Sequence, residues 1–149
     1  MTLHDDIRGA WELVSYTTQD DQGGPIGYPL GPDAEGLIMY THDGYMSAQL
    51  MRVDRPAYDQ PDTAGGTAAQ HAAAAAGYLA YSGPYAVDEA TGIVHHEVAV
   101  SLLPNWLGTV QLRHSSREAD RLTLTAEAPL NDRTIRSTLV WARAPEHDI

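Results

Sequence analysis

The sequence predicts an all-β protein with one short inserted helix, and three observations support this prediction. Apolar and polar residues alternate with a period of two through most of the chain, which is typical of half-buried strands. Clusters of Gly, Pro, Asn and Asp separate these stretches at even spacing, and about eight to ten strands fit between them. Only one segment has the pattern of a helix. We expect residues 1–149 to form a single domain, either an antiparallel barrel or a sandwich.

The first third of the chain contains the clearest hairpin. A strand at 11–16 is followed by a turn-rich stretch at 20–36. Strands at 37–41 and 45–51 flank a tight turn at Asp43-Gly44, because this dipeptide readily adopts the positive φ that a hairpin turn requires.

The middle of the chain contains the only convincing helix. Residues 52–66 read as a loop with two prolines and two glycines, and Thr67 can then cap a helix over 68–76 that Gly77 ends. Most side chains of this helix are methyl groups, so it can pack closely against another surface. Two roles are open, a lid over a barrel mouth or a plug inside the barrel.

The last part of the chain returns to the strand pattern. Short strands at 78–82 and 85–87 flank Gly83-Pro84, and a turn at 88–92 leads into a long strand at 93–102, which Pro104-Asn105-Trp106 ends. The remaining predicted strands are 109–115, 121–126 and 134–143.

The composition excludes several classes of function. The chain has 20 Asp and Glu residues against 9 basic residues, all of them Arg, which gives a net charge of −11. So acidic a protein repels phosphate backbones and is not expected to bind nucleic acid. Without Lys there is no P-loop or Schiff-base lysine. Without Cys there are no disulfides, thiolate nucleophiles or iron–sulfur clusters.

The sequence also predicts a cytoplasmic protein that does not bind membranes. The N-terminus lacks the basic segment and apolar core of a signal peptide. The longest apolar run, Ala72–Ala76, is far too short to cross a bilayer.

Several motifs resemble the lipocalins and, more specifically, the bacterial and fungal lipocalin-like domain proteins. Gly9-Ala10-Trp11 near the start and Arg143 near the end are similar to the lipocalin pair in which an Arg stacks on a Trp that plugs one end of the barrel. Further stretches that carry the resemblance are 11–15, 36–41, 43–47, 77–83, 95–97, 103–109, Gln111, Arg113 and 122–124. The resemblance implies a closed antiparallel up-and-down barrel with an internal cavity, but it fixes no activity.

His96 is the leading candidate for chemistry. Alternation along 93–102 places His96 and Val98 on the face with Val94, inside the barrel, and His95 outside. An inward His can act as a general acid or base. Equally, it can be a core histidine satisfied by a buried Tyr or a backbone carbonyl. Because His95 and His96 point in opposite directions, we expect no metal site.

The other candidate residues would polarise or contact a bound molecule. Tyr40, Tyr81 and Arg113 could hold a substrate oxygen. Arg113 shares a face with Gln111, opposite apolar residues, which favours an outward orientation, whereas the family resemblance favours an inward one. The expected contacts with the bound molecule are Trp106, Met39, Met46, Gln111, Tyr45 and Val98.

Two functions fit this picture. Our leading hypothesis is a cofactor-free cyclase or isomerase of secondary metabolism, for example one promoting pericyclic closure of a polyketide-like substrate, with His96 as proton shuttle. It rests on the inward His among Tyr residues and on analogy with small barrels of similar shape. The alternative is a non-catalytic carrier of a hydrophobic metabolite. In both cases the partner is a small hydrophobic molecule, and a homodimer is left open.

Overall fold

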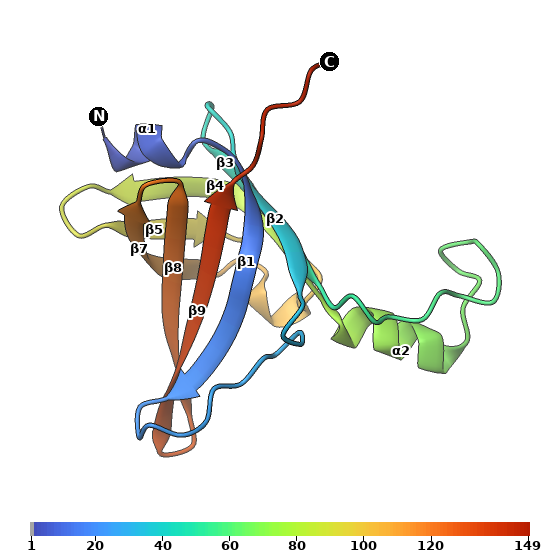
Figure 1. Ribbon diagram of the computed structural model, residues 1–149. Helices are drawn as coiled ribbons and strands as arrows, with labels where there is room; N and C mark the ends of the chain where they lie inside the picture. Colours follow the sequence, from blue (N-terminus) through green and yellow to red (C-terminus); the bar gives the residue numbers. More distant parts are fainter. Residues whose placement is uncertain (1) are drawn as a thin grey trace.

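A computed structural model describes residues 2–149, in which eight antiparallel strands close into a barrel (Figure 1). The sheet order is β3-β2-β1-β9-β8-β7-β5-β4, and pairing of β3 with β4 closes the circle. The barrel strands are β1 (Gly9–Asp20), β2 (Glu35–Tyr40), β3 (Tyr45–Met51), β4 (Tyr78–Asp88), β5 (Ile93–Glu97), β7 (Val110–Glu118), β8 (Arg121–Leu130) and β9 (Arg133–Arg143). A two-residue strand, β6 (Val100–Ser101), pairs with β4 as an extra strand. The predicted lipocalin-like barrel is thereby confirmed.

The β2–β3 hairpin matches its prediction. Its turn has Gly44 at φ 98°, and the Thr41 N–H donates to the Tyr45 carbonyl at 2.7 Å. Strand β3 covers the predicted residues 45–51. A short-range signal therefore determined a short-range structure.

Two predictions for the strands at 78–102 were wrong, and for a shared reason. Strand β4 runs unbroken through Gly83-Pro84, while the predicted long strand ends at Glu97. A Cβ on Gly83 would lie 1.9 Å from the Glu97 carbonyl oxygen, so the two backbones touch there. Beyond Glu97 the alternation of faces fails, because Val98 is buried whereas Val100 is 61% exposed.

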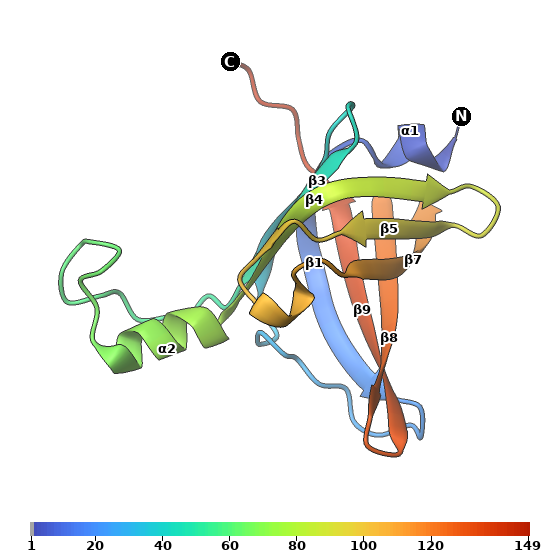
Figure 2. The same ribbon diagram turned by 180° about the vertical axis from the view of Figure 1, so that it is seen from behind.

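The helix α2 (Ala68–Ala76) has the predicted bounds, with a capping box formed by Thr67 and Gln70. Its position was not predictable. The helix and the loop before it project sideways from the barrel (Figures 1 and 2), and no residue of α2 is buried. Among the strands it contacts only β4 appreciably, and it does not border the barrel interior. It is therefore neither lid nor plug.

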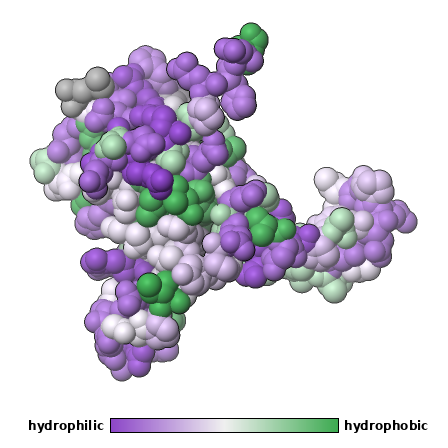
Figure 3. Space-filling view, viewed as in Figure 1, coloured by the Kyte–Doolittle hydropathy of each residue, from purple (hydrophilic) through white to green (hydrophobic). Residues whose placement is uncertain are grey.

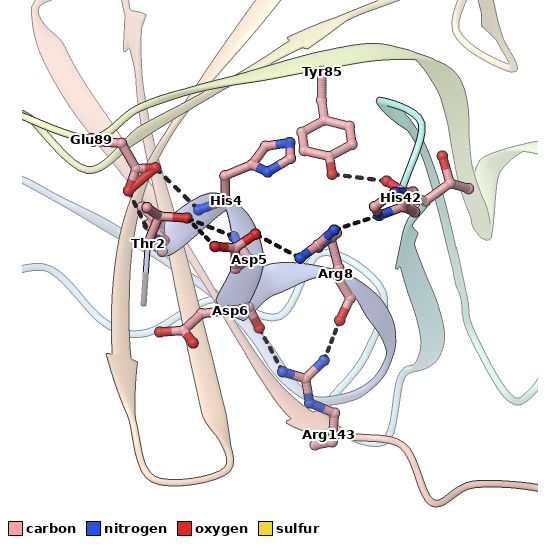
Figure 4. A network of polar contacts seen from close by, with 11 residues as sticks. Thr2, His4, Asp5, Asp6, Arg8, His42, Tyr85, Glu89 and Arg143 are labelled. Atoms are coloured by element: carbon pink, nitrogen blue, oxygen red, sulfur yellow. Dashed lines mark hydrogen bonds and ion pairs between the residues drawn. The ribbon is translucent and has the colours of Figure 1, made fainter.

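A second helix, α1 (Leu3–Ile7), was not predicted and covers one end of the barrel. Figure 4 shows the polar network that holds it: Glu89 accepts the Leu3 and His4 N–H groups at 2.6 and 3.1 Å. Arg143 donates to the carbonyls of Asp6 and Arg8, at 2.5 Å each.

Trp11 lies beneath α1 and is fully buried. Its Nε1–H donates to the Ile7 carbonyl at 2.9 Å, and the Arg143 guanidinium lies 3.8 Å from its ring centroid. The predicted stacking of Arg143 on Trp11 is confirmed. We call this end, with α1, Trp11 and Arg143, the closed end.

The outer surface is largely hydrophilic on the face shown in Figure 3, with apolar side chains in small groups. This agrees with the excess of 20 acidic over 9 basic residues. Within residues 2–149, neither helix has the length and apolar character needed to cross a bilayer.

Candidate binding cavity

The barrel encloses a cavity of about 400 Å³ toward the end opposite α1. Its walls come from β1, β2, β3, β4, β7, β8 and β9, together with Trp106. Tyr16, Glu127 and Ser137 lie in the parts of β1, β8 and β9 that run away from the closed end (Figure 1). Most of the lining is apolar and includes Ile38, Leu50, Leu79, Leu124, Leu139 and Trp141. A few polar side chains join them, including Tyr16, Tyr81, Gln111 and Arg113. The volume and character suit a small, mainly apolar molecule.

His96 lies behind this cavity, between two tyrosines. Its Nε2 is 2.7 Å from the Tyr40 hydroxyl and its Nδ1 is 2.9 Å from the Tyr81 hydroxyl. Each of the three residues comes from a different strand, and each is at most 5% exposed. In the structure His96 is thus a core histidine whose hydrogen bonds are satisfied by two tyrosines. It does not have the arrangement expected of a general acid or base that reaches a substrate.

The buried trio has shifted pKa values. Burial, aided by the positive charge of Arg113, lowers the pKa of His96 to about 3. Burial also raises the pKa of Tyr81, and it raises that of Tyr40 well above its ordinary value. All three groups are therefore neutral at neutral pH, which suits hydrogen bonding better than proton transfer.

Arg113 and Gln111 point inward. Their neighbours Leu112 and Val110 are 48% and 50% exposed, so the apolar face of β7 is the outer one. The family resemblance indicated this orientation correctly, whereas hydrophobic alternation alone indicated the reverse. Gln111 Nε2 donates to Thr109 Oγ1 at 2.9 Å, which fixes the amide beside the cavity.

Trp106 links these side chains at the cavity wall. It follows β6 in a 3₁₀ turn, Pro104–Trp106, and packs against the core. Its ring meets that of Tyr81 edge-on, with centroids 5.1 Å apart, and the Arg113 guanidinium lies 5.7 Å from its centroid.

Four of the expected contact residues lie elsewhere. Met46 and Val98 are buried in the core but do not line the cavity. Met39 and Tyr45 are 40% and 55% exposed and face outward, which corrects their assignment. The reason is the strand pleat: their neighbours Tyr40 and Met46 point inward, so they cannot.

Sequence reasoning missed Tyr16, which lines the cavity together with Ser137. Regular alternation along the predicted strand 11–16 would put Tyr16 on the face opposite Trp11. The pairing of β1 with β9 has a bulge between Leu13 and Ser15, which shifts the register and turns Tyr16 inward. The sequence contains no local signal for that bulge.

No described group of three or more His, Asp and Glu side chains is arranged to hold a metal ion. His95 and His96 lie on opposite faces of β5, His96 fully buried and His95 partly exposed.

Comparison with known proteins fixes the family. Residues 8–144 match the lipocalin-like domain family. The chain belongs to this family. A curated relative from Aspergillus oryzae (strain ATCC 42149 / RIB 40) is 39% identical over 108 residues, covering 67% of this chain and 97% of the relative. That fungal protein is named 4'-hydroxy-3'-methoxypropiophenone carrier protein ppsC.

The name of this relative contradicts our leading hypothesis. It describes a carrier, whereas the sequence led us to expect a cyclase or isomerase. The comparison favours the alternative, a non-catalytic carrier of a hydrophobic metabolite. The inward-facing His96 misled the functional prediction, because inward orientation alone does not distinguish a proton shuttle from a satisfied core histidine.

Proposed function

We propose that this lipocalin-like protein binds a small, largely apolar aromatic molecule inside its barrel and carries it unchanged. The observation that supports this most is the cavity of about 400 Å³, with apolar walls and a small polar cluster at Tyr81, Gln111 and Arg113. Such a cavity can bury most of a ligand of one aromatic ring while the polar groups orient it. The fungal relative, named for carrying an aromatic ketone, supports the same class of ligand.

The polar groups of the cavity suit recognition. His96 has both ring nitrogens bonded to tyrosine hydroxyls and does not itself line the cavity. With its pKa near 3, the imidazole stays neutral and has no proton to gain or lose near neutral pH. Tyr81, which does line the cavity, is a neutral phenol and thus a hydrogen-bonding group.

Stoichiometric binding and recovery test this proposal. The protein would be titrated with 4'-hydroxy-3'-methoxypropiophenone while tryptophan fluorescence is followed, since Trp106 and Trp141 line the cavity. We expect saturation at one ligand per chain and recovery of the unchanged compound after denaturation. Turnover of the compound into a new species by native protein alone would contradict a carrier function.

A cavity-filling variant tests whether the ligand binds inside the barrel. Ala126 lines the cavity, so Ala126→Trp should abolish binding while the far-ultraviolet circular dichroism stays that of a β protein. Ala86→Trp is the matched control, because Ala86 lies exposed on the outside of β4. Equal binding by both variants would place the ligand outside the barrel.

A cytoplasmic location and a homodimer stay predictions of this proposal. Cell fractionation and analytical ultracentrifugation test them.

A further inference from the structure

Arg113 brings a positive charge into the cavity wall that no carboxylate of residues 2–149 neutralises in a salt bridge. Its guanidinium donates a hydrogen bond to the carbonyl of its own neighbour, Leu112, at 3.0 Å. Glu127 also lines the cavity, but it pairs with Arg136 at 2.7 Å. Five other arginines form ion pairs: Arg8, Arg52, Arg121, Arg133 and Arg136. A half-buried cation without a counter-ion is well placed to bind an anionic ligand group.

The hydrogen bonds of His96 determine where the Tyr81 proton points. The Tyr40 hydroxyl bonds only to His96 Nε2 within the described chain, and Tyr40 is 2% exposed. Its proton must go to Nε2, because a buried donor without an acceptor is costly. The imidazole proton then sits on Nδ1 and is donated to the Tyr81 oxygen. The Tyr81 proton is left free for an acceptor in the cavity.

Two hydrogen-bond donors therefore meet at one place in the wall. The Arg113 charge acts on Tyr81 directly, since it opposes the larger effect of burial on the pKa of that phenol. Trp106 contacts both side chains. The edge of one ring meets the face of the other in its contact with Tyr81, and the Arg113 guanidinium lies over the Trp106 ring. A donor hydroxyl beside a cation is complementary to a negatively charged oxygen.

We propose that the cavity binds its ligand through an anionic oxygen, a phenolate or carboxylate, which accepts hydrogen bonds from Tyr81 and Arg113. This inference rests on the proposed carrier function and specifies the ligand group that is recognised. The apolar remainder of the ligand lies against the aliphatic wall, which includes Leu79, Leu124 and Leu139.

Because the protein as a whole is acidic, a preference of the cavity for an anionic ligand has to come from charges close to the site. A net charge of −11 disfavours anions at a distance, so an anion can be preferred only where a nearby cation outweighs that field. Arg113 is the only Arg that lines the cavity within residues 2–149. Removing it should therefore abolish the preference for the anion and can reverse it.

The titratable groups around the site allow a clean pH experiment. Tyr16 faces the cavity from β1 and Glu127 from β8, while Tyr40 on β2 and His96 on β5 lie behind Tyr81. Strands β3 and β9 contribute no titratable lining residue. The pKa of His96 lies near 3, and burial raises the pKa of Tyr16, Tyr40 and Tyr81. A change in affinity between about pH 6 and 9 then reports the ligand's own ionisation.

The test compares an acidic phenol with its neutral ether. Dissociation constants would be measured from about pH 6 to 9 for 4'-hydroxy-3'-methoxypropiophenone and its 4'-O-methyl ether. We expect the phenol to bind more tightly as the pH rises through its pKa and the ether to show no pH dependence. In Arg113→Met the phenolate should bind about tenfold or more weakly, and Tyr81→Phe should weaken it severalfold. The ether should be little affected by Arg113→Met.

Arg121→Met is the matched control, since it removes the same charge from an exposed position outside the cavity. Thermal unfolding checks that each variant is folded. Two results would overturn the proposal that the ligand binds through an anionic oxygen: equal, pH-independent affinities for the phenol and the ether, or equal affinities of Arg113→Met and Arg121→Met for the phenolate. Neither result would contradict the carrier function. Failure of both compounds to bind at saturating concentration would overturn both proposals.

Discussion

At the closed end of the barrel Trp11 and Arg143 find hydrogen-bond acceptors within the protein, whereas at the cavity Trp141 and Arg113 keep polar groups that residues 2–149 do not pair. The Arg143 guanidinium lies 3.8 Å from the Trp11 ring centroid and donates to two carbonyls, and the indole N–H of Trp11 donates to the Ile7 carbonyl. Arg117 also lies over Trp11, at 5.0 Å, and its buried Nε is the one exception, without a hydrogen-bond partner in the described chain. At the cavity, Arg113 has no carboxylate partner in the described chain, and the buried Nε1 of Trp141 has no hydrogen-bond partner there.

This difference shows how one barrel separates stability from binding. Groups whose hydrogen bonds are complete within the protein stabilise the fold and have no capacity left for a ligand. Groups left with free donors contribute less to the fold but can bind. Substitutions of the same kind at the two ends should therefore have different effects.

The largest difference between the two ends should come from the two buried tryptophans. Trp11→Phe removes the hydrogen bond to Ile7 and leaves a buried carbonyl unpaired, whereas Trp141→Phe removes a donor that has no partner. The loss of side-chain volume is the same in both. We expect Trp11→Phe to cost about 1–3 kcal/mol more in free energy of unfolding, measured with denaturant. If Trp141→Phe lowers the free energy of unfolding as much as Trp11→Phe or more, the proposed difference between the two ends is wrong.

His96 should make stability depend on pH. Its folded pKa, near 3, is below the unfolded value of about 6.5, so the unfolded state binds a proton first. The contribution is fully present above about pH 6.5 and is lost as the pH falls toward 3, at up to about 1.4 kcal/mol per pH unit. Denaturant titrations at several pH values would measure this slope.

His96→Gln is the matched variant, because an amide can also donate and accept a hydrogen bond but does not titrate. The variant should be less stable than the wild type at neutral pH and should lose less stability on acidification. Parallel pH profiles for the two proteins would show that His96 is not the group responsible.

The smallest effect should come from the helix cap at the closed end. Glu89→Gln keeps the shape but removes the charge that accepts the first two N–H groups of α1. We expect a loss of about 0.5–1 kcal/mol in unfolding free energy and unchanged ligand affinity. A change in ligand affinity would show that the two ends are coupled.

The sequence predicted those parts of the fold whose signals are local. Asp43-Gly44 determined the hairpin, and Thr67 with Gly77 determined the bounds of α2. The continuity of β4 and the early end of β5 depend instead on contact between Gly83 and Glu97, which are far apart along the chain. Alternation could not reveal that contact.

The cavity was predictable only in part for the same reason. The resemblance to lipocalin-like proteins correctly turned Gln111 and Arg113 inward, against the apolar pattern of β7. Tyr16 was missed because the bulge in β1 has no local signal. The inward direction of His96 followed from alternation, but its two tyrosine partners come from other strands and emerged only with the closed barrel.

A crystal structure of the protein with 4'-hydroxy-3'-methoxypropiophenone would test the central claim most directly. We predict one unmodified molecule inside the barrel, its phenolic oxygen within hydrogen-bonding distance of Arg113 and Tyr81 and its propionyl group against the aliphatic wall. A ligand seated on the outer surface, or inside the cavity with its phenolic oxygen turned away from Arg113, would contradict the account.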